Sequence, residues 1–113
     1  MSTHSAVVSF SRCPDYMADI ESALVRTLMP LGGLESFVRP GQRVLVKPNL
    51  LTSRPPQEAV TTHPEIVRAL LRLIRRIGAD PLVADSPANA VRMDAVWDKT
   101  GFRQMCNEES VPL

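Results

Sequence analysis

The chain has 113 residues, of which 44% are hydrophobic and 22% are charged, and its formal net charge is +1. This composition suits one globular domain with an aliphatic core, because only 4% of the residues are aromatic. The balanced charge argues against a nucleic-acid or anionic-membrane partner, and no apolar run approaches the ~20 residues that span a bilayer. The first residues carry no signal-peptide pattern, so we expect a cytoplasmic protein.

The first half of the chain predicts two strands around one helix. Ala6–Phe10 is a short apolar run that predicts a buried strand. Met17–Leu28 has apolar residues spaced by three and four, which predicts an amphipathic helix, with Asp15 as a plausible N-cap. Arg43–Lys47 predicts a second strand, and its continuous Val-Leu-Val centre is typical of a strand buried on both faces.

The second half begins with a long loop, Lys47–Thr62, which three prolines keep from forming regular structure. The strongest helical pattern follows, with Pro64 at its first position and Gly78 as its stop. Four arginines of this helix form a face that we expect to be solvated: Arg68, Arg72, Arg75 and Arg76. The remaining expected elements are a strand at Asp80–Asp85, a loop at Ser86–Asn89, a helix from about Arg92 to Thr100 and a short helix from Phe102 to Glu109.

The expected order β-α-β-α-β-α, with helices between strands, predicts an α/β fold with a mainly parallel sheet and right-handed crossovers. We interpret it as a three-layer or partial α/β sandwich. Residues 1–113 form a single domain in this interpretation. Only three strands are complete, and Val111–Leu113 resembles the entry to a fourth. We therefore expect the chain to be the N-terminal part of a longer domain.

Polar side chains follow the predicted strands and open the main helix. In open α/β sheets, ligands bind beyond the carboxyl ends of the strands. A helix start adds free N–H groups that favour phosphate or carboxylate. We therefore predict a crevice that binds a small anionic ligand, with His63 and Asp85 as candidate catalytic groups. Its candidate ligand-binding residues are Lys47, Asn49, Thr61, Thr62 and Ser86.

Four of these residues also have a structural interpretation. Lys47 either reaches solvent along its aliphatic stem or points into the crevice, where it pairs with an anion or with Asp85. Asn49 is also typical of a turn that bonds its own backbone. His63 is a ligand, a proton carrier or a residue that simply faces water near the helix start. Asp85 either holds a ligand or accepts hydrogen bonds in the turn that follows it.

The sequence favours no cofactor within this chain. Cys13 and Cys106 are far apart and form neither a Cys-x-x-Cys pair nor a metal-ligand ladder. A metal site built on His63 and Asp85 would have too few ligands, so we predict no metal. The glycine-rich signatures of dinucleotide and P-loop sites are also missing from the sequence.

Three strings of residues, with two shorter ones, resemble the domain of unknown function 362 family. The longer strings are residues 44–51, 59–67 and 83–87, and the shorter ones are Leu31–Leu34 and Thr100–Phe102. The resemblance implies that this chain matches the N-terminal portion of longer proteins. Many members carry a ferredoxin-like iron–sulfur segment, which would lie beyond Leu113 here.

Two functional hypotheses follow, and the sequence does not decide whether the protein is an enzyme. In the first, the chain is the N-terminal α/β module of an iron–sulfur or redox-associated protein, and its polar crevice binds a small anion. In the second, the module is a non-catalytic scaffold that docks an electron-transfer domain. Its partner is then the remainder of a longer polypeptide or a ferredoxin-like domain.

Overall fold

The computed structural model describes residues 5–87 and 91–113 and shows a mixed α/β chain. The helices are α1 (Ile20–Leu28), α2 (Pro64–Ile77), α3 (Met93–Lys99) and α4 (Phe102–Glu108), and the strands are β1 (Arg43–Val46) and β2 (Asp80–Val83). Short 3-10 turns lie at Met29–Leu31, Leu34–Ser36 and Pro56–Glu58. The expected fold class is therefore confirmed at the level of an α/β chain.

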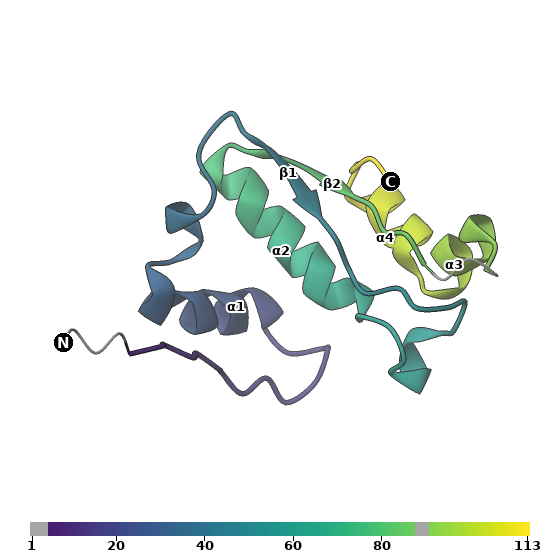
Figure 1. Cartoon of the computed structure of the whole chain (residues 1–113), viewed down its shortest axis with the longest axis horizontal. Helices are drawn as coiled ribbons and strands as arrows, with labels where there is room; N and C mark the ends of the chain where they lie inside the picture. The colour runs from purple at the N-terminus through teal and green to yellow at the C-terminus, as the bar shows by residue number, and fades with distance from the viewer. Residues whose placement is uncertain (1–4, 88–90) are drawn as a thin grey trace.

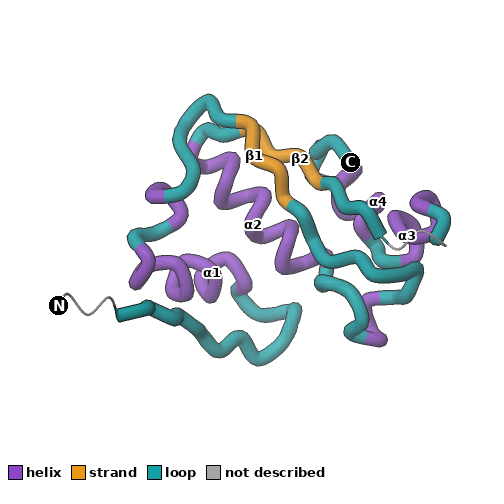
Figure 2. The backbone as a smooth tube through the Cα atoms, in the orientation of Figure 1, coloured by secondary structure: helices purple, strands orange, loops and turns teal. Residues whose placement is uncertain are grey.

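The sheet consists of β1 and β2, which pair in parallel with Arg43 opposite Asp80 and Val46 opposite Val83. Helix α2 connects the two strands and runs along one face of the sheet (Figures 1 and 2). The predicted β-α-β unit is thus confirmed. Because the strands are parallel, their carboxyl ends lie at one edge of the sheet, and the residues that follow the two strands meet there.

The core is aliphatic, as the composition predicts, and α2 supplies much of it. Val67, Leu71 and Ile74 of α2 are at most 3% exposed. They pack against the strands, α3 and α4, in a cluster that includes Leu50, Val83, Val96, Phe102, Met105 and Cys106. Gly78 ends α2 with a φ of 91°, a left-handed conformation that glycine adopts without steric cost.

The expected strand at Ala6–Phe10 is wrong. The structure assigns no strand there, and Val8 and Phe10 are 86% and 90% exposed. The segment lies beyond α1, well away from β1 and β2 (Figure 1). Apolar, β-branched composition favours a strand only where a neighbouring strand offers a partner, and no strand within the described residues pairs with this segment.

The expected burial of β1 on both faces is also wrong. Val46 is 9% exposed and packs toward α2, whereas Leu45 on the opposite face is 57% exposed. Residues alternate between the two faces of a strand, so one face of this sheet is covered and the other is open in the part of the chain that the structure describes. The third layer of the expected sandwich is therefore not confirmed.

Several element boundaries differ from the sequence-based expectation. Helix α1 begins at Ile20 rather than Met17, because Asp19 is its N-cap and accepts a hydrogen bond from Ser22 N at 3.0 Å. Asp15 instead accepts from Met17 N at 2.8 Å, which forms a local turn. Strand β2 ends at Val83, before Asp85. Asn89, in the expected loop after β2, lies outside the described residues.

The end of the chain lies beside β2, although it forms no assigned strand. Val83 N donates a hydrogen bond to the carbonyl oxygen of Pro112 at 3.0 Å, and Val111 is buried. None of the helices in the described ranges is long and apolar enough to cross a bilayer.

Candidate functional site

Lys47 and Asp85 meet at the carboxyl edge of the sheet. Lys47 directly follows β1, and Asp85 comes two residues after β2. The Lys47 ammonium lies 2.7 Å from Oδ1 of Asp85. The Asp85 side chain is 4% exposed, whereas that of Lys47 is 64% exposed. The pair is therefore a buried carboxylate covered by a cation whose outer side faces solvent.

Asp85 also fixes the start of the long loop. Its Oδ2 accepts a hydrogen bond from Leu50 N at 2.9 Å, and Leu50 is fully buried. Oδ1 has the Lys47 ammonium beside it but no hydrogen bond of good angular geometry. One carboxylate thus holds both the cation and the backbone that follows it.

The electrostatic balance at Asp85 favours the charged form. Burial is the largest influence and raises the pKa of this carboxyl. The adjacent Lys47 ammonium and hydrogen bonds from the backbone N–H groups of Leu50 and Ser86 act in the opposite direction and outweigh burial. The resulting pKa lies below the ordinary value of an aspartate, so Asp85 is ionised at neutral pH.

The two ends of the long loop are held together by Asn49 and Thr62. Asn49 N donates to Oγ1 of Thr62 at 3.0 Å, and Thr62 N donates to the carbonyl oxygen of Asn49 at 3.0 Å. Thr62 therefore has a structural role in closing the loop. The neighbouring Thr61 hydroxyl is buried and has no hydrogen-bond partner in the described residues.

His63 is the N-cap of α2. Its Nδ1 accepts a hydrogen bond from Glu65 N at 3.2 Å, and its ring stacks on Tyr16 with centroids 3.6 Å apart and planes 6° from parallel. Burial lowers the pKa of His63, and the charge of Glu65 partly opposes that shift. No hydrogen bond or ion pair joins His63 to Lys47 or Asp85 in the described structure. Tyr16 was missed by sequence reasoning, because the stack depends on how the N-terminal loop folds back.

The donors at the start of α2 are largely used within the chain. Pro64 has no N–H, Glu65 N is bonded to the His63 ring, and Ile66 N donates to the His63 carbonyl oxygen at 3.2 Å. An anion at this helix start would have to displace these bonds. The cation best placed for an anion at this edge of the sheet is therefore Lys47.

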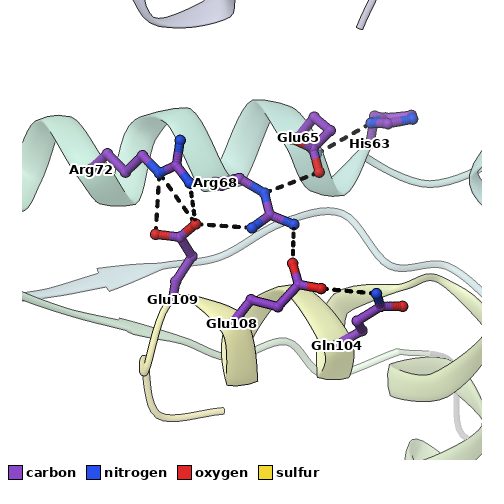
Figure 3. A network of polar contacts seen from close by, with 7 residues as sticks. All are labelled: His63, Glu65, Arg68, Arg72, Gln104, Glu108 and Glu109. Atoms are coloured by element: carbon purple, nitrogen blue, oxygen red, sulfur yellow. Dashed lines mark hydrogen bonds and ion pairs between the residues drawn. The ribbon is translucent and has the colours of Figure 1, made fainter. Parts of the chain in front are cut away.

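The arginine face of α2 is not simply solvated, which corrects the sequence-based expectation. Arg68 bonds Glu65 of its own helix at 3.0 Å, and Glu108 and Glu109 at the end of α4 at 2.6 and 2.9 Å (Figure 3). Arg72 reaches Glu109 as well, at 2.7 Å. Arg75 bonds the Ser110 carbonyl oxygen, and Arg76 pairs with Glu21 of α1.

The network of Arg68, Arg72, Glu108 and Glu109 ties α2 to α4. Burial opposes the charge on Arg68, whose side chain is 18% exposed, but its bonds to the three glutamates raise its pKa above the ordinary value. Hydrogen bonding from Arg72 is the main reason that the pKa of Glu109 is lowered. The sequence predicted none of these contacts, and Glu108 and Glu109 are some forty residues away along the chain.

The two cysteines do not fit an iron–sulfur cluster. Cys13 is exposed, and Cys106 is buried among apolar side chains of the core. Burial raises the pKa of the Cys106 thiol to about 11, so this sulfur is a neutral thiol rather than a thiolate ligand. Two cysteines are also fewer than the four thiolates that such clusters ordinarily use.

The fold and the site together define an α/β module with a charged pair at the carboxyl edge of a parallel sheet. The family model described as a domain of unknown function (DUF362) matches residues 44–113. The chain therefore belongs to the DUF362 family. This result confirms the resemblance identified from the sequence strings.

A curated relative is the thylakoid-associated protein sll1697 of Synechocystis sp.. It is 48% identical over 107 residues, which cover 94% of this chain and 33% of the relative. The chain thus spans about a third of the length of the curated relative it matches. The relative's name places that protein with thylakoids, and the cytoplasmic location expected for this chain stays a prediction. No solved structure matches the chain.

Proposed function

We propose that this chain is the ligand-binding α/β module of a longer DUF362 protein, and that the edge of the sheet at the carboxyl ends of β1 and β2 binds a small anion. The observation that supports the proposal is the ion pair of Lys47 with Asp85. The buried carboxylate of Asp85 holds the Lys47 ammonium in place, and the Lys47 side chain is 64% exposed to solvent. A positioned cation of this kind attracts a carboxylate or phosphate with little further ordering of the protein.

The residues that would surround the anion come from the same edge of the sheet. Asn49 is exposed and follows Lys47 by two residues, and its backbone is fixed by Thr62. The Thr61 hydroxyl is buried and has no partner in the described structure, so a ligand could supply one. Ser86 is exposed next to Asp85. In this proposal Lys47 binds the anion, while Asn49, Thr61 and Ser86 orient it.

A proton-transfer role is proposed for Asp85 or His63 only after ligand binding. Asp85 is ionised and could accept a proton, which would require that the ligand weaken its pairing with Lys47. His63 is neutral near pH 7, because burial lowers its pKa. Its Nδ1 is used in the cap, so any transfer would use Nε2.

The test is a titration with anions, followed by the backbone amide signals of the isotopically labelled chain. Inorganic phosphate and citrate are added at constant ionic strength, with chloride as the reference salt. Saturable shifts at Asn49, Leu50 and Ser86 are expected. Lys47→Met should abolish them, and Lys47→Arg should keep them. Shifts that persist in Lys47→Met would remove Lys47 from the site.

Arg43 provides a matched control at the other end of the same strand. Its pair with Asp80 has an N–O distance of 3.9 Å, and both side chains are about three-quarters exposed. Arg43→Met removes one positive charge from β1, as Lys47→Met does, but leaves the carboxyl edge intact. Equal loss of anion binding in both variants would indicate a general charge effect and would contradict the proposal.

The second candidate function, a scaffold, is favoured by the open face of the sheet. Leu45 is 57% exposed in the centre of β1, although parallel sheets are ordinarily covered on both faces. In this proposal the remainder of a longer polypeptide, or an iron–sulfur domain within it, packs on that face. Iron and sulfide analysis of the full-length protein tests the redox association, and a full-length protein without either would contradict it.

A further inference from the structure

A polar hollow lies between the long loop and the end of α3, and none of the site residues above lines it. Its volume is about 540 Å³. It is built from the middle of the loop on one side and from the last turn of α3 on the other. Its lining residues are Thr52, Ser53, Arg54, Pro55, Glu58 and Lys99.

The two cations of this hollow, Arg54 and Lys99, have few ionic contacts with the described protein. Lys99 makes no ion pair in the described part of the chain, whereas the chain's other lysine, Lys47, is held by Asp85. Arg54 contacts Glu58 at 3.4 Å, and the two side chains are 59% and 44% exposed. Exposed pairs of this kind contribute little to stability, so an anion competes easily for the guanidinium.

Two hydroxyl groups lie beside these cations. Thr52 and Ser53 are half-buried, and within the described structure neither side chain donates a hydrogen bond to a protein group. The backbone between them is bent by a hydrogen bond from Arg54 N to the Thr52 carbonyl oxygen at 2.9 Å. The hollow therefore combines a guanidinium, an ammonium and two hydroxyl groups.

The long loop packs against the segment between α3 and α4 beside the hollow. A Cβ added to Gly101 would be 3.5 Å from Cγ of Pro64 and 3.9 Å from Cγ of Pro56, which is ordinary van der Waals contact. Pro55 and Pro56 restrict the backbone next to Arg54. Arg54 and Lys99 line the same hollow, one from the loop and one from the end of α3.

We propose that this hollow binds the phosphate group of a phosphorylated small molecule. A tetrahedral oxyanion has enough acceptor oxygens for the guanidinium fork, the ammonium and both hydroxyl groups at once, which a carboxylate has not. Glu58 opposes the anion and is the residue that it displaces from Arg54. The site is separate from the edge of the sheet at Lys47 and Asp85, because it uses different cations and different hydroxyl groups.

The test uses inorganic phosphate and glycerol phosphate as separate probes at constant ionic strength, with amide signals of the labelled chain as the readout. Saturable shifts at Ser53, Arg54 and Lys99 are expected with either probe. If only glycerol phosphate produces them, the site is supported and its ligand is a phosphate monoester. Arg54→Met and Lys99→Met should each weaken binding at least tenfold. Glu58→Gln should tighten it about threefold, an effect that a purely structural residue would not produce.

The controls separate this site from the Lys47 crevice. Lys47→Met and Arg43→Met should leave the shifts at Ser53 and Lys99 unchanged. Arg43, Arg54, Glu58 and Lys99 are exposed, so their variants are expected to fold. Lys47→Met removes the cation beside the buried Asp85, so its folded state is checked by urea denaturation before the titration. No saturable shift with either probe, or unchanged affinity in both Arg54→Met and Lys99→Met, would overturn the proposal. Loss of these shifts in Lys47→Met would show one shared site and would also overturn it.

Discussion

The ammonium of Lys47 lies 2.7 Å from the buried carboxylate of Asp85, and this contact joins the carboxyl ends of the two strands. The same carboxylate accepts a hydrogen bond from Leu50 N, so it also determines where the long loop begins. The pair therefore links the fold to the candidate site. The proposed anion binding depends on this arrangement, in which the buried Asp85 positions the Lys47 ammonium and solvent can reach the Lys47 side chain.

Asp85→Ala should destabilise the chain. The substitution leaves Leu50 N without its acceptor in a buried position and removes the partner of Lys47. An unsatisfied buried donor costs ~1–3 kcal/mol, so we expect a loss of about 2 kcal/mol in the free energy of unfolding. Asp85→Asn keeps an acceptor for Leu50 N and should cost about half as much. Urea denaturation measures both, and equal stability of wild type and Asp85→Ala would contradict this role.

His63 should make the stability depend on pH. Its Nδ1 accepts from Glu65 N only in the neutral form, and burial lowers its pKa below the ordinary 6.5. The stability that the His63 cap contributes is therefore fully present above pH 6.5, and it is lost as the pH falls through the lower pKa of His63 in the folded state. An N-cap contributes ~1 kcal/mol, which sets the expected size of the loss.

His63→Ser separates this effect from the titration of carboxylates. Serine caps a helix without titrating, so the variant should lose the pH dependence between about pH 5 and 7 while it keeps most of the stability. Chemical denaturation across this pH range provides the measurement. An identical pH profile in wild type and His63→Ser would show that another group is responsible.

Arg68→Met should weaken the attachment of α4 to α2. Glu109, with a side chain 9% exposed, would lose one of its two arginines, and Glu108 would lose its contact with α2. Removal of one partner from a partly buried network leaves uncompensated charge, and we expect a cost of about 2 kcal/mol. Arg103→Met, whose contacts to Asp94 and Asp98 are exposed, is the control and should cost under ~1 kcal/mol. Similar thermal shifts in the two variants would contradict the difference in burial.

Leu45→Gln should be nearly neutral in this chain. The side chain is 57% exposed on the open face of β1, and surface substitutions ordinarily change stability by less than ~0.5 kcal/mol. Val46→Ala, on the covered face of the same strand, should cost ~1–2 kcal/mol because it removes buried methyl groups. Equal costs would indicate that the face carrying Leu45 is covered after all.

The parts of the fold that local pattern specifies were predicted well. Helix α2 has a proline at its first position, a glycine at its stop and a wide apolar stripe, and all of these act within a few residues along the chain. The pairing of β1 with β2 follows from the helix between them. From that pairing the sequence could place Lys47 and Asp85 at one edge of the sheet.

The predictions that failed depend on contacts between residues that are far apart in the sequence. Ala6–Phe10 has the composition of a strand but no neighbour to pair with in the described structure. Arg68 was expected to face solvent, since nothing in its own helix reveals that Glu108 and Glu109 lie opposite. His63 was placed near the crevice by its position in the sequence, whereas the stack on Tyr16 accounts for its ring.

The pKa of Asp85, followed by NMR in wild type and in Lys47→Met, tests the central claim most directly. The claim predicts a wild-type pKa below that of an ordinary aspartate, which should rise above the ordinary value in the variant because burial is then less opposed. An Asp85 that titrates at its ordinary value, and at the same value in both proteins, would contradict the claim that Lys47 and this buried carboxylate form the centre of the site.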